Sequence, residues 1–89
     1  MIWKVTFKDE AVKQLRKLNP NIQDRITNYL RTRIATEEDP RRFGKALTGD
    51  LKGLWRYRVD DYRIVCLIDN DILTVLIVKI GHRRNIYVK

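Results

Sequence analysis

The stretch WRYRVDDYRIV, residues 55–65, places the strongest constraint on what this chain can fold into. Aromatic or apolar residues alternate with arginines on both sides of two adjacent aspartates, which is the pattern of two half-buried strands joined by a tight turn. With Asp60 and Asp61 as the turn, we expect Arg58 to lie directly opposite Arg63. A slip of one residue would separate the two arginines, so this pairing depends on the turn.

The two faces of this hairpin differ in chemistry, because side chains alternate across a strand. The expected core face carries Trp55, Tyr57, Val59, Tyr62, Ile64 and Cys66. The charged face carries Arg56, Arg58, Arg63 and Val65. Like charges directly opposite each other destabilise a sheet, and a bound anion would remove this repulsion. The alternative is a solvated face whose arginines pair with nearby aspartates.

The hydrophobic periodicity of the whole chain predicts one domain, residues 1–89, with the order β-α-α-β-β-β. Asp9 is expected to cap the first helix, and Pro20 to separate it from the second. The fold class is therefore α+β: a largely antiparallel sheet of about four strands with a helical hairpin on one face. The expected elements are strands at 2–7, 54–59, 62–68 and 72–80, and helices at 9–18 and 21–36.

Between the helices and the hairpin, residues 37–53 show no regular periodicity. This stretch holds a proline and three of the four glycines, so it is expected to be a long loop with a short helical or extended piece. Its basic side chains are candidates for RNA binding: Arg41, Arg42, Lys45 and Lys52.

The charge of the chain favours an acidic partner. Nineteen lysines and arginines against eleven acidic residues give a net charge of +8. A basic small domain suits nucleic acid, through phosphate neutralisation, but would equally suit an acidic protein. The longest apolar run, residues 72–78, is too short to span a bilayer. No secretory signal pattern opens the chain, so we expect no membrane association and a cytoplasmic location. The one cysteine, Cys66, is expected in the core.

The final stretch GHRRNIYVK adds polar side chains after the last predicted strand. His82 and Arg84 are candidates for phosphate contacts, and a tyrosine near a basic face, here Tyr87, could stack on a base or transfer a proton. No metal-ligand spacing, phosphate-binding glycine loop or nucleophile–histidine pattern occurs, so no cofactor or metal is expected.

These segments together resemble the RelE/ParE superfamily of toxins from toxin–antitoxin systems, and the RelE branch most closely. The resemblance covers nearly the whole chain and is carried by FKDEAVKQLRKL, GLWRYRVDDYRIV and IGHRRNIY. It implies a metal-independent, ribosome-dependent endoribonuclease that cuts mRNA in the A site and inhibits translation. In that reaction the 2′-hydroxyl attacks the adjacent phosphate, giving a cyclic phosphate and a free 5′-hydroxyl.

The resemblance also assigns candidate roles. The catalytic positions of the family fall on Arg56, Arg58, Arg63, Arg83 and Tyr87. The best-known family member has lysines where this chain has Arg56 and Arg58, and an arginine is a very poor general base. Two alternatives are therefore left open: the base is Tyr87, His82 or a lysine such as Lys52, or the cut relies on positioning and charge with little proton transfer.

Two other functions stay open. A ParE-like protein would poison DNA gyrase without cutting RNA, and a third possibility is an inactive module that only binds RNA or an antitoxin. In each case the resemblance implies a cognate antitoxin with an acidic or amphipathic segment that wraps the domain. For the nuclease, the ribosome and mRNA are the further partners.

Overall fold

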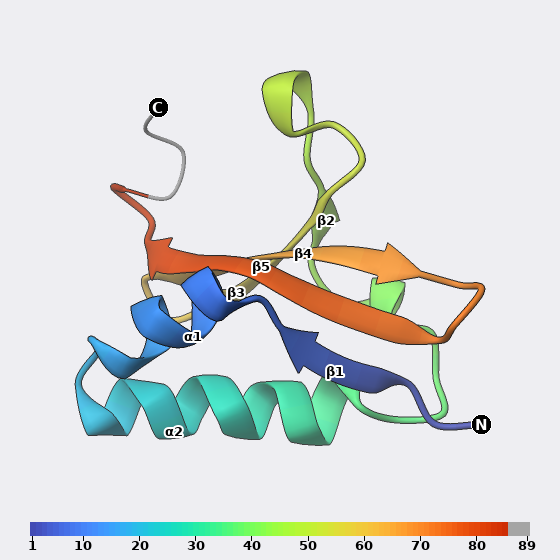
Figure 1. The fold of residues 1–89 in the computed structure, drawn as a ribbon, viewed down its shortest axis with the longest axis horizontal. Helices are drawn as coiled ribbons and strands as arrows, with labels where there is room; N and C mark the ends of the chain where they lie inside the picture. Colours follow the sequence, from blue (N-terminus) through green and yellow to red (C-terminus); the bar gives the residue numbers. More distant parts are fainter. Residues whose placement is uncertain (86–89) are drawn as a thin grey trace.

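The computed structural model describes residues 1–85 and has a five-stranded mixed sheet with two helices on one face (Figure 1). The strand order is β1-β5-β4-β3-β2, with β1 parallel to β5 and the other pairs antiparallel. This confirms the α+β fold class and the helical hairpin. The strands are β1 (Lys4–Phe7), β2 (Lys45–Ala46), β3 (Trp55–Val59), β4 (Tyr62–Asp69) and β5 (Thr74–His82). The helices are α1 (Asp9–Arg16) and α2 (Pro20–Tyr29).

The fifth strand comes from the basic loop, where the sequence predicted a short helical or extended piece. In residues 37–53 the chain forms a 3-10 turn η2 (Pro40–Arg42), the short strand β2 and a second 3-10 turn η3 (Gly49–Leu51). Gly44, before β2, has a φ of +77°, and a Cβ there would lie 2.2 Å from the carbonyl oxygen of Arg56. Only glycine therefore allows the loop to approach β3 closely enough to add β2 to the sheet.

The helix boundaries differ from the prediction at two points. Lys8 occupies the N-cap position of α1 without a side-chain hydrogen bond, so the expected cap at Asp9 was wrong. Asp9 is instead the first helical residue, where its negative charge favours the helix N-terminus. α2 is capped by Asn19, whose Oδ1 accepts from the amide of Asn21 at 2.9 Å. After Tyr29 the helix widens into a π-helical turn η1 (Leu30–Ile34).

The core lies between the helices and the sheet. Ala11, Ile26, Leu30 and Ile34 from the helical layer are buried against one side of the strands. The strand side chains buried with them are Tyr57, Val59, Ile64, Cys66, Val75, Ile77 and Ile80. Cys66 is a free, fully buried thiol, as expected for a core residue. Burial raises the pKa of this thiol to about 12.

The β3–β4 hairpin has the register that its sequence predicts. Val59 pairs with Tyr62, Arg58 with Arg63, and Arg56 with Val65. Asp60 adopts a positive φ of 52°, a conformation that Asp tolerates better than most residues because its short side chain can bond locally. The core and charged faces of the hairpin are thereby confirmed.

The β4–β5 pairing contains a β-bulge that the sequence did not indicate. Val65 pairs with Lys79 and the next residue, Cys66, pairs with Ile77, so Val78 is passed over. The bulge resets the alternation of β5, since both Ile77 and Ile80 face the core. Near the bulge, the backbone amide of Ile80 donates to Oε1 of Gln14 on α1 at 2.7 Å.

Candidate nucleic-acid interface

The side of the sheet away from the helices carries two rows of residues that cross the strands. One row is Lys45, Arg56, Val65 and Lys79, on β2, β3, β4 and β5. The other is Arg58, Arg63 and Gly81, on β3, β4 and β5. We call these residues the arginine face. Residues paired across strands share a face, so strand register alone brings these five cations together.

The arginines of this face differ in exposure. Arg58 is exposed, whereas only 9% of Arg63 is exposed. One guanidinium nitrogen of Arg63 donates to the carbonyl oxygens of Asp60 at 3.3 Å and Tyr62 at 3.2 Å. Arg63 is thus drawn toward the β3–β4 turn, at the end of the sheet where β5 also ends.

Arg56 is half-buried, and its Nε is buried without a hydrogen-bond acceptor in the part of the chain that the structure describes. A buried donor without an acceptor is unfavourable. Because this atom is buried, a phosphate oxygen would accept from it only after neighbouring side chains move. Arg56 therefore differs from a fully exposed surface arginine, because one of its hydrogen-bond donors is buried.

The acidic residues that the structure describes form no ion pair with Arg56 or Arg58. The ion pairs of the described residues include Arg25–Asp60, Arg41–Asp39 and Arg42–Glu38. None of them includes Arg56 or Arg58. Asp60 is directed to Arg25 on α2, 2.6 Å away, and so serves the helical layer. The alternative in which the turn aspartates pair with these two strand arginines is therefore not what the structure adopts.

The residues after β5 are anchored at the same turn. The backbone amide of Arg83 donates to the carbonyl oxygen of Asp61 at 2.8 Å, so the backbone of Arg83 lies beside the turn that also binds Arg63. Arg83 and Arg84 are exposed. Tyr87, the fifth predicted catalytic residue, lies outside the described residues.

His82 lies on the other face of the sheet. It pairs with Tyr62, and the two rings meet edge to face with centroids 5.5 Å apart. Its Nδ1 accepts from the amide of Arg84 at 3.2 Å, which assigns the ring proton to Nε2 in the neutral form. The structure therefore does not bring His82 together with the strand arginines.

The four basic residues of the loop are divided between different places. Lys45 joins the arginine face, and Lys52 is exposed next to η3, in the loop that projects from the open side of the sheet (Figure 1). Arg41 donates to Oδ1 of Asn70 at 2.9 Å, in the β4–β5 turn. Asn70 is seven residues along the chain from Arg63, roughly 20 Å at the rise of a strand. The guanidinium of Arg41 therefore lies far from Arg63.

Arg42 lies apart from the arginine face as well. Its guanidinium stacks 4.7 Å from the centroid of Phe43 and pairs with Glu38 at 3.4 Å. It also donates to the carbonyl oxygen of Arg33. These contacts join η2 to the helical layer, so Arg42 has a structural explanation within the fold. RNA binding by Arg41 and Arg42 stays a prediction.

Lys79 belongs to the arginine face, and sequence reasoning missed it. Alternation counted from the core residues Val75 and Ile77 assigns Lys79 to the core side. The bulge at Val78 reverses that assignment and makes Lys79 the partner of Val65. No sequence pattern marks this bulge. The one available indication is that a lysine is rarely buried, which argues against placing Lys79 on the core side.

The described side chains with clearly raised pKa values are core groups. Burial raises the pKa of Tyr57, whose hydroxyl donates to the carbonyl oxygen of Pro40 at 2.7 Å, and burial is also the main cause that raises the pKa of Tyr29. Neither phenol is suited to accept a proton at neutral pH. Among residues 1–85, no group of three or more His, Cys, Asp or Glu side chains could hold a metal ion. The described residues of the arginine face can therefore contribute to a reaction through their positive charge.

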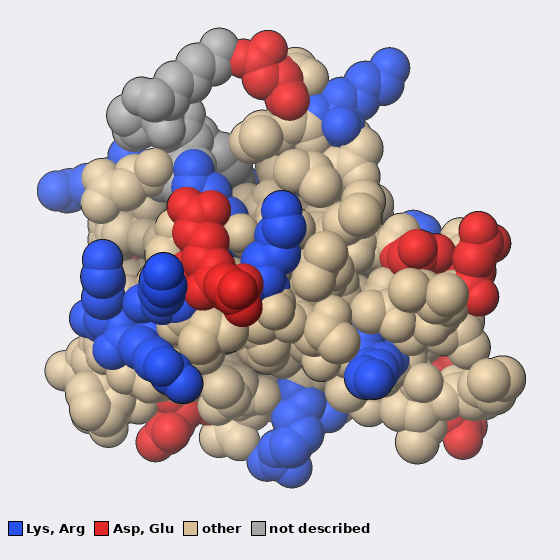
Figure 2. All heavy atoms as spheres, viewed as in Figure 1, with Lys and Arg blue, Asp and Glu red and all other residues tan. Residues whose placement is uncertain are grey.

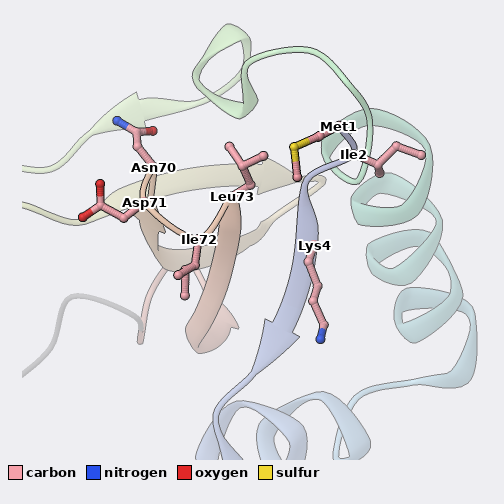
Figure 3. Close-up of a pocket in the computed structure, with 7 residues that line it drawn as sticks. All are labelled: Met1, Ile2, Lys4, Asn70, Asp71, Ile72 and Leu73. Carbon is pink, nitrogen blue, oxygen red and sulfur yellow. The ribbon is translucent and has the colours of Figure 1, made fainter.

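Two views show what lies outside this face. Figure 2 shows Lys and Arg side chains spread over several elements, with Asp and Glu side chains between some of them. Figure 3 shows an open, largely apolar pocket of about 560 Å³ between the start of the chain and the β4–β5 turn. None of the described helices is long and apolar enough to cross a membrane.

Comparisons with known proteins agree with this architecture. Residues 5–87 match the family described as the ParE toxin of the type II toxin-antitoxin system parDE. Toxin RelG of Mycobacterium tuberculosis is 33% identical over 87 residues, which cover 98% of each chain. In the toxin-antitoxin complex RelBE2 from M. tuberculosis, a chain with 29% identity superimposes with a TM-score of 0.84, over 96% of this chain and 95% of that one. A chain of the archaeal RelE-RelB complex from Pyrococcus horikoshii has 28% identity and a TM-score of 0.72, over 96% and 99%.

Proposed function

The chain belongs to the RelE/ParE superfamily and is a toxin of a type II toxin–antitoxin system; from this premise we propose that it acts as a ribosome-dependent endoribonuclease. It cleaves mRNA in the ribosomal A site and thereby inhibits translation. The proposed site of action is cytoplasmic, where translating ribosomes and mRNA are its partners. No metal takes part in the proposed reaction.

The observation that carries this proposal is the charge of Arg56 and Arg58, which no described acidic side chain pairs. Arg56 and Arg58 have no ion pair with a described acidic residue, and Arg56 keeps a buried Nε donor without an acceptor. Opposed arginines on neighbouring strands repel each other, as Arg58 and Arg63 do here. A phosphate diester bound to these guanidinium groups would remove the repulsion. RNA is therefore the ligand that best explains why these like charges lie together on one face.

The proposed chemistry uses these cations as the charge on phosphorus grows. The 2′-oxygen of the substrate attacks the adjacent phosphorus, the bond to the 5′-oxygen breaks, and a cyclic phosphate forms. Arg63 and Arg83 stabilise the additional negative charge on the phosphoryl oxygens, and Arg56 and Arg58 hold the substrate backbone. Arg63 and Arg83 are both tied to carbonyl oxygens of the β3–β4 turn, which supports a shared role.

The proton acceptor for the 2′-hydroxyl is not an arginine, because guanidinium does not lose its proton in proteins. Of the candidates Tyr87, His82 and Lys52, we favour Tyr87. His82 faces the helical layer, and Lys52 is an exposed residue in the η3 loop. Most of the rate enhancement is proposed to come from positioning and charge stabilisation.

A second candidate function is suggested by the family description, which names ParE. In that case the protein would poison DNA gyrase by binding and would not cut RNA. The proposal of a nuclease is favoured by the joint presence of Arg63 and Arg83 beside the strand arginines. Tyr87 completes the set in the sequence.

For the antitoxin, we propose a partner with an acidic or amphipathic segment that covers the arginine face. The related chains from M. tuberculosis and P. horikoshii are found in a toxin–antitoxin complex and a RelE–RelB complex. A negative segment on this face would occupy the same donors as RNA and thereby inhibit the toxin.

The test is primer extension on mRNA from cells in which the protein is induced alone. We expect cuts within translated codons and none in RNA that is free of ribosomes. Arg63→Ala and Arg83→Ala should abolish the cuts while circular dichroism shows a folded protein. Arg16→Ala on α1 is the matched control, because it removes the same charge from an exposed position of the helical layer. Intact mRNA together with gyrase-linked DNA breaks would overturn the nuclease in favour of the second function.

A further inference from the structure

Lys79 lies on the arginine face because of the bulge in β5. It is the cross-strand partner of Val65, in the row that also contains Lys45 and Arg56. The bulge at Val78 lets the core residues Ile77 and Ile80 point to the helices while Lys79, between them, points away. The pairing of β5, an interior strand of the sheet, is thus irregular at Val78. As a result, a lysine of this strand lies on the side of the sheet away from the helices.

Lys79 places a positive charge on the opposite side of β4 from the arginines of β3. Arg56 and Lys79 stand on either side of Val65, about 10 Å apart at two strand spacings. Val65 is only 2% exposed, and the next row ends in Gly81, which adds no side chain. One uncharged residue of β4, Val65, therefore lies between Arg56 of β3 and Lys79 of β5, and the next residue of β4 on this face is Arg63. A polyanionic chain lying across this face would have cations of β3 on one side and Lys79 of β5 on the other.

Lys79 has no internal partner that would explain its place. In the part of the chain that the structure describes, no side-chain hydrogen bond or ion pair of Lys79 occurs. The hydrogen bond near the bulge is made by the backbone of Ile80 to Gln14 and does not involve the lysine side chain. The ammonium group is therefore available for a ligand above the sheet.

We propose that Lys79 binds a backbone phosphate of RNA, on the side of the arginine face opposite to Arg56 and Arg58. This inference rests on the proposed function, since it names a further contact for the same substrate. The lysine acts through its charge, as a compact cation that contacts a phosphate oxygen. Replacement by arginine keeps that charge, so Lys79→Arg should retain binding and cleavage within about threefold.

The experiment measures the affinity for a short single-stranded oligoribonucleotide at several salt concentrations, without ribosomes. Each phosphate contact contributes about 0.7 to the slope of log affinity against log salt for a single strand. Lys79→Met should lower the magnitude of the slope by about that amount, equally for different RNA sequences. Lys13→Met is the matched control, since it removes one exposed lysine from α1, and its slope should equal that of the unchanged protein.

Cleavage is the second readout. On translating ribosomes, Lys79→Met should cut about tenfold more slowly, the effect of one lost charge-assisted hydrogen bond, whereas Lys79→Arg should cut normally. Thermal unfolding of each variant shows whether it is folded, and Lys79→Gln replaces Lys79→Met if the methionine variant is not.

The outcomes separate this inference from the proposed function. An unchanged slope in Lys79→Met, or an equal decrease in Lys13→Met, overturns the contact at Lys79. If the unsubstituted protein leaves translated mRNA intact, the proposed nuclease activity is wrong. The salt dependence of binding to isolated RNA still decides in that case whether Lys79 binds phosphate. Loss of binding in Lys79→Arg would also contradict a role through charge.

Discussion

Asp60 in the β3–β4 turn and Arg25 on α2 form an ion pair of 2.6 Å that joins the hairpin to the helical layer. The carbonyl oxygen of the same aspartate accepts from Arg63, and the next carbonyl, of Asp61, accepts from the amide of Arg83. One short turn therefore connects a helix with the two arginines proposed to stabilise the transition state. Its carboxylate is directed to the helix and does not neutralise the arginine face.

This relationship predicts that the backbone conformation at Asp60 matters more than its charge. Asp60→Asn tolerates the positive φ and should lower the free energy of unfolding by at most about 1 kcal/mol, since the pair with Arg25 is exposed and screened. Asp60→Val places a β-branched residue at a φ of 52° and should lower it by about 1–3 kcal/mol. Urea unfolding of the two variants compares them. Equal losses would show that the conformation at this turn is not a constraint.

Removing the repulsion on the arginine face should stabilise the protein. Arg58 is exposed and lies opposite Arg63, so Arg58→Gln should raise the free energy of unfolding by about 0.2–1 kcal/mol at low salt. The gain should shrink as salt screens the charges. The same variant should lose activity in the primer-extension assay. A variant that is less stable than the unchanged protein at low salt would show that the pair does not repel.

Gln14 should stabilise the end of β5 through the acceptor that it offers to the amide of Ile80. Gln14→Leu leaves this half-buried amide without an acceptor, and we expect a loss of about 1–3 kcal/mol in the free energy of unfolding. Gln14→Glu keeps an oxygen acceptor and is the control. Hydrogen exchange of the Ile80 amide should accelerate in the leucine variant only. Equal exchange in both variants would mean that the contact contributes nothing.

The free energy of unfolding should fall with alkaline pH because of buried acids in the core. Cys66 ionises near 9 when exposed, and burial raises its pKa to about 12 in the folded protein. The raised pKa stabilises the fold fully below pH 9, and this contribution is lost as pH rises toward 12, by about 1 kcal/mol at pH 10. Tyr57, with a raised pKa of the same origin, adds to the loss at higher pH.

Urea unfolding between pH 8 and 11 measures this loss, and Cys66→Ala should flatten the part that begins near pH 9. A thiol reagent supplies the control. At pH 8 it should modify Cys66 in urea but not in the folded protein, since the side chain is fully buried. Rapid modification of the native protein would contradict both expectations.

Local rules were sufficient for much of the fold. Alternation around two aspartates predicts the β3–β4 pairing residue by residue, because a tight turn leaves little freedom of register. The helical hairpin follows equally from apolar periodicity and from Pro20. A short extended piece was expected in residues 37–53, but its place in the sheet as β2 was not predicted, since two residues carry no periodicity and their pairing depends on the close approach of Gly44 to β3.

The sequence by itself therefore determined which arginines share a face of the hairpin, since that depends on neighbours along the chain. Only the tertiary structure decided which other side chains join them. The bulge at Val78 transfers Lys79 to the arginine face, and strand pairing sends His82 to the opposite side with Tyr62. Both outcomes depend on how β5 packs against the helices and bonds to β4. Such long-range contacts fix the twist and register of a central strand, and no local pattern in the chain encodes them.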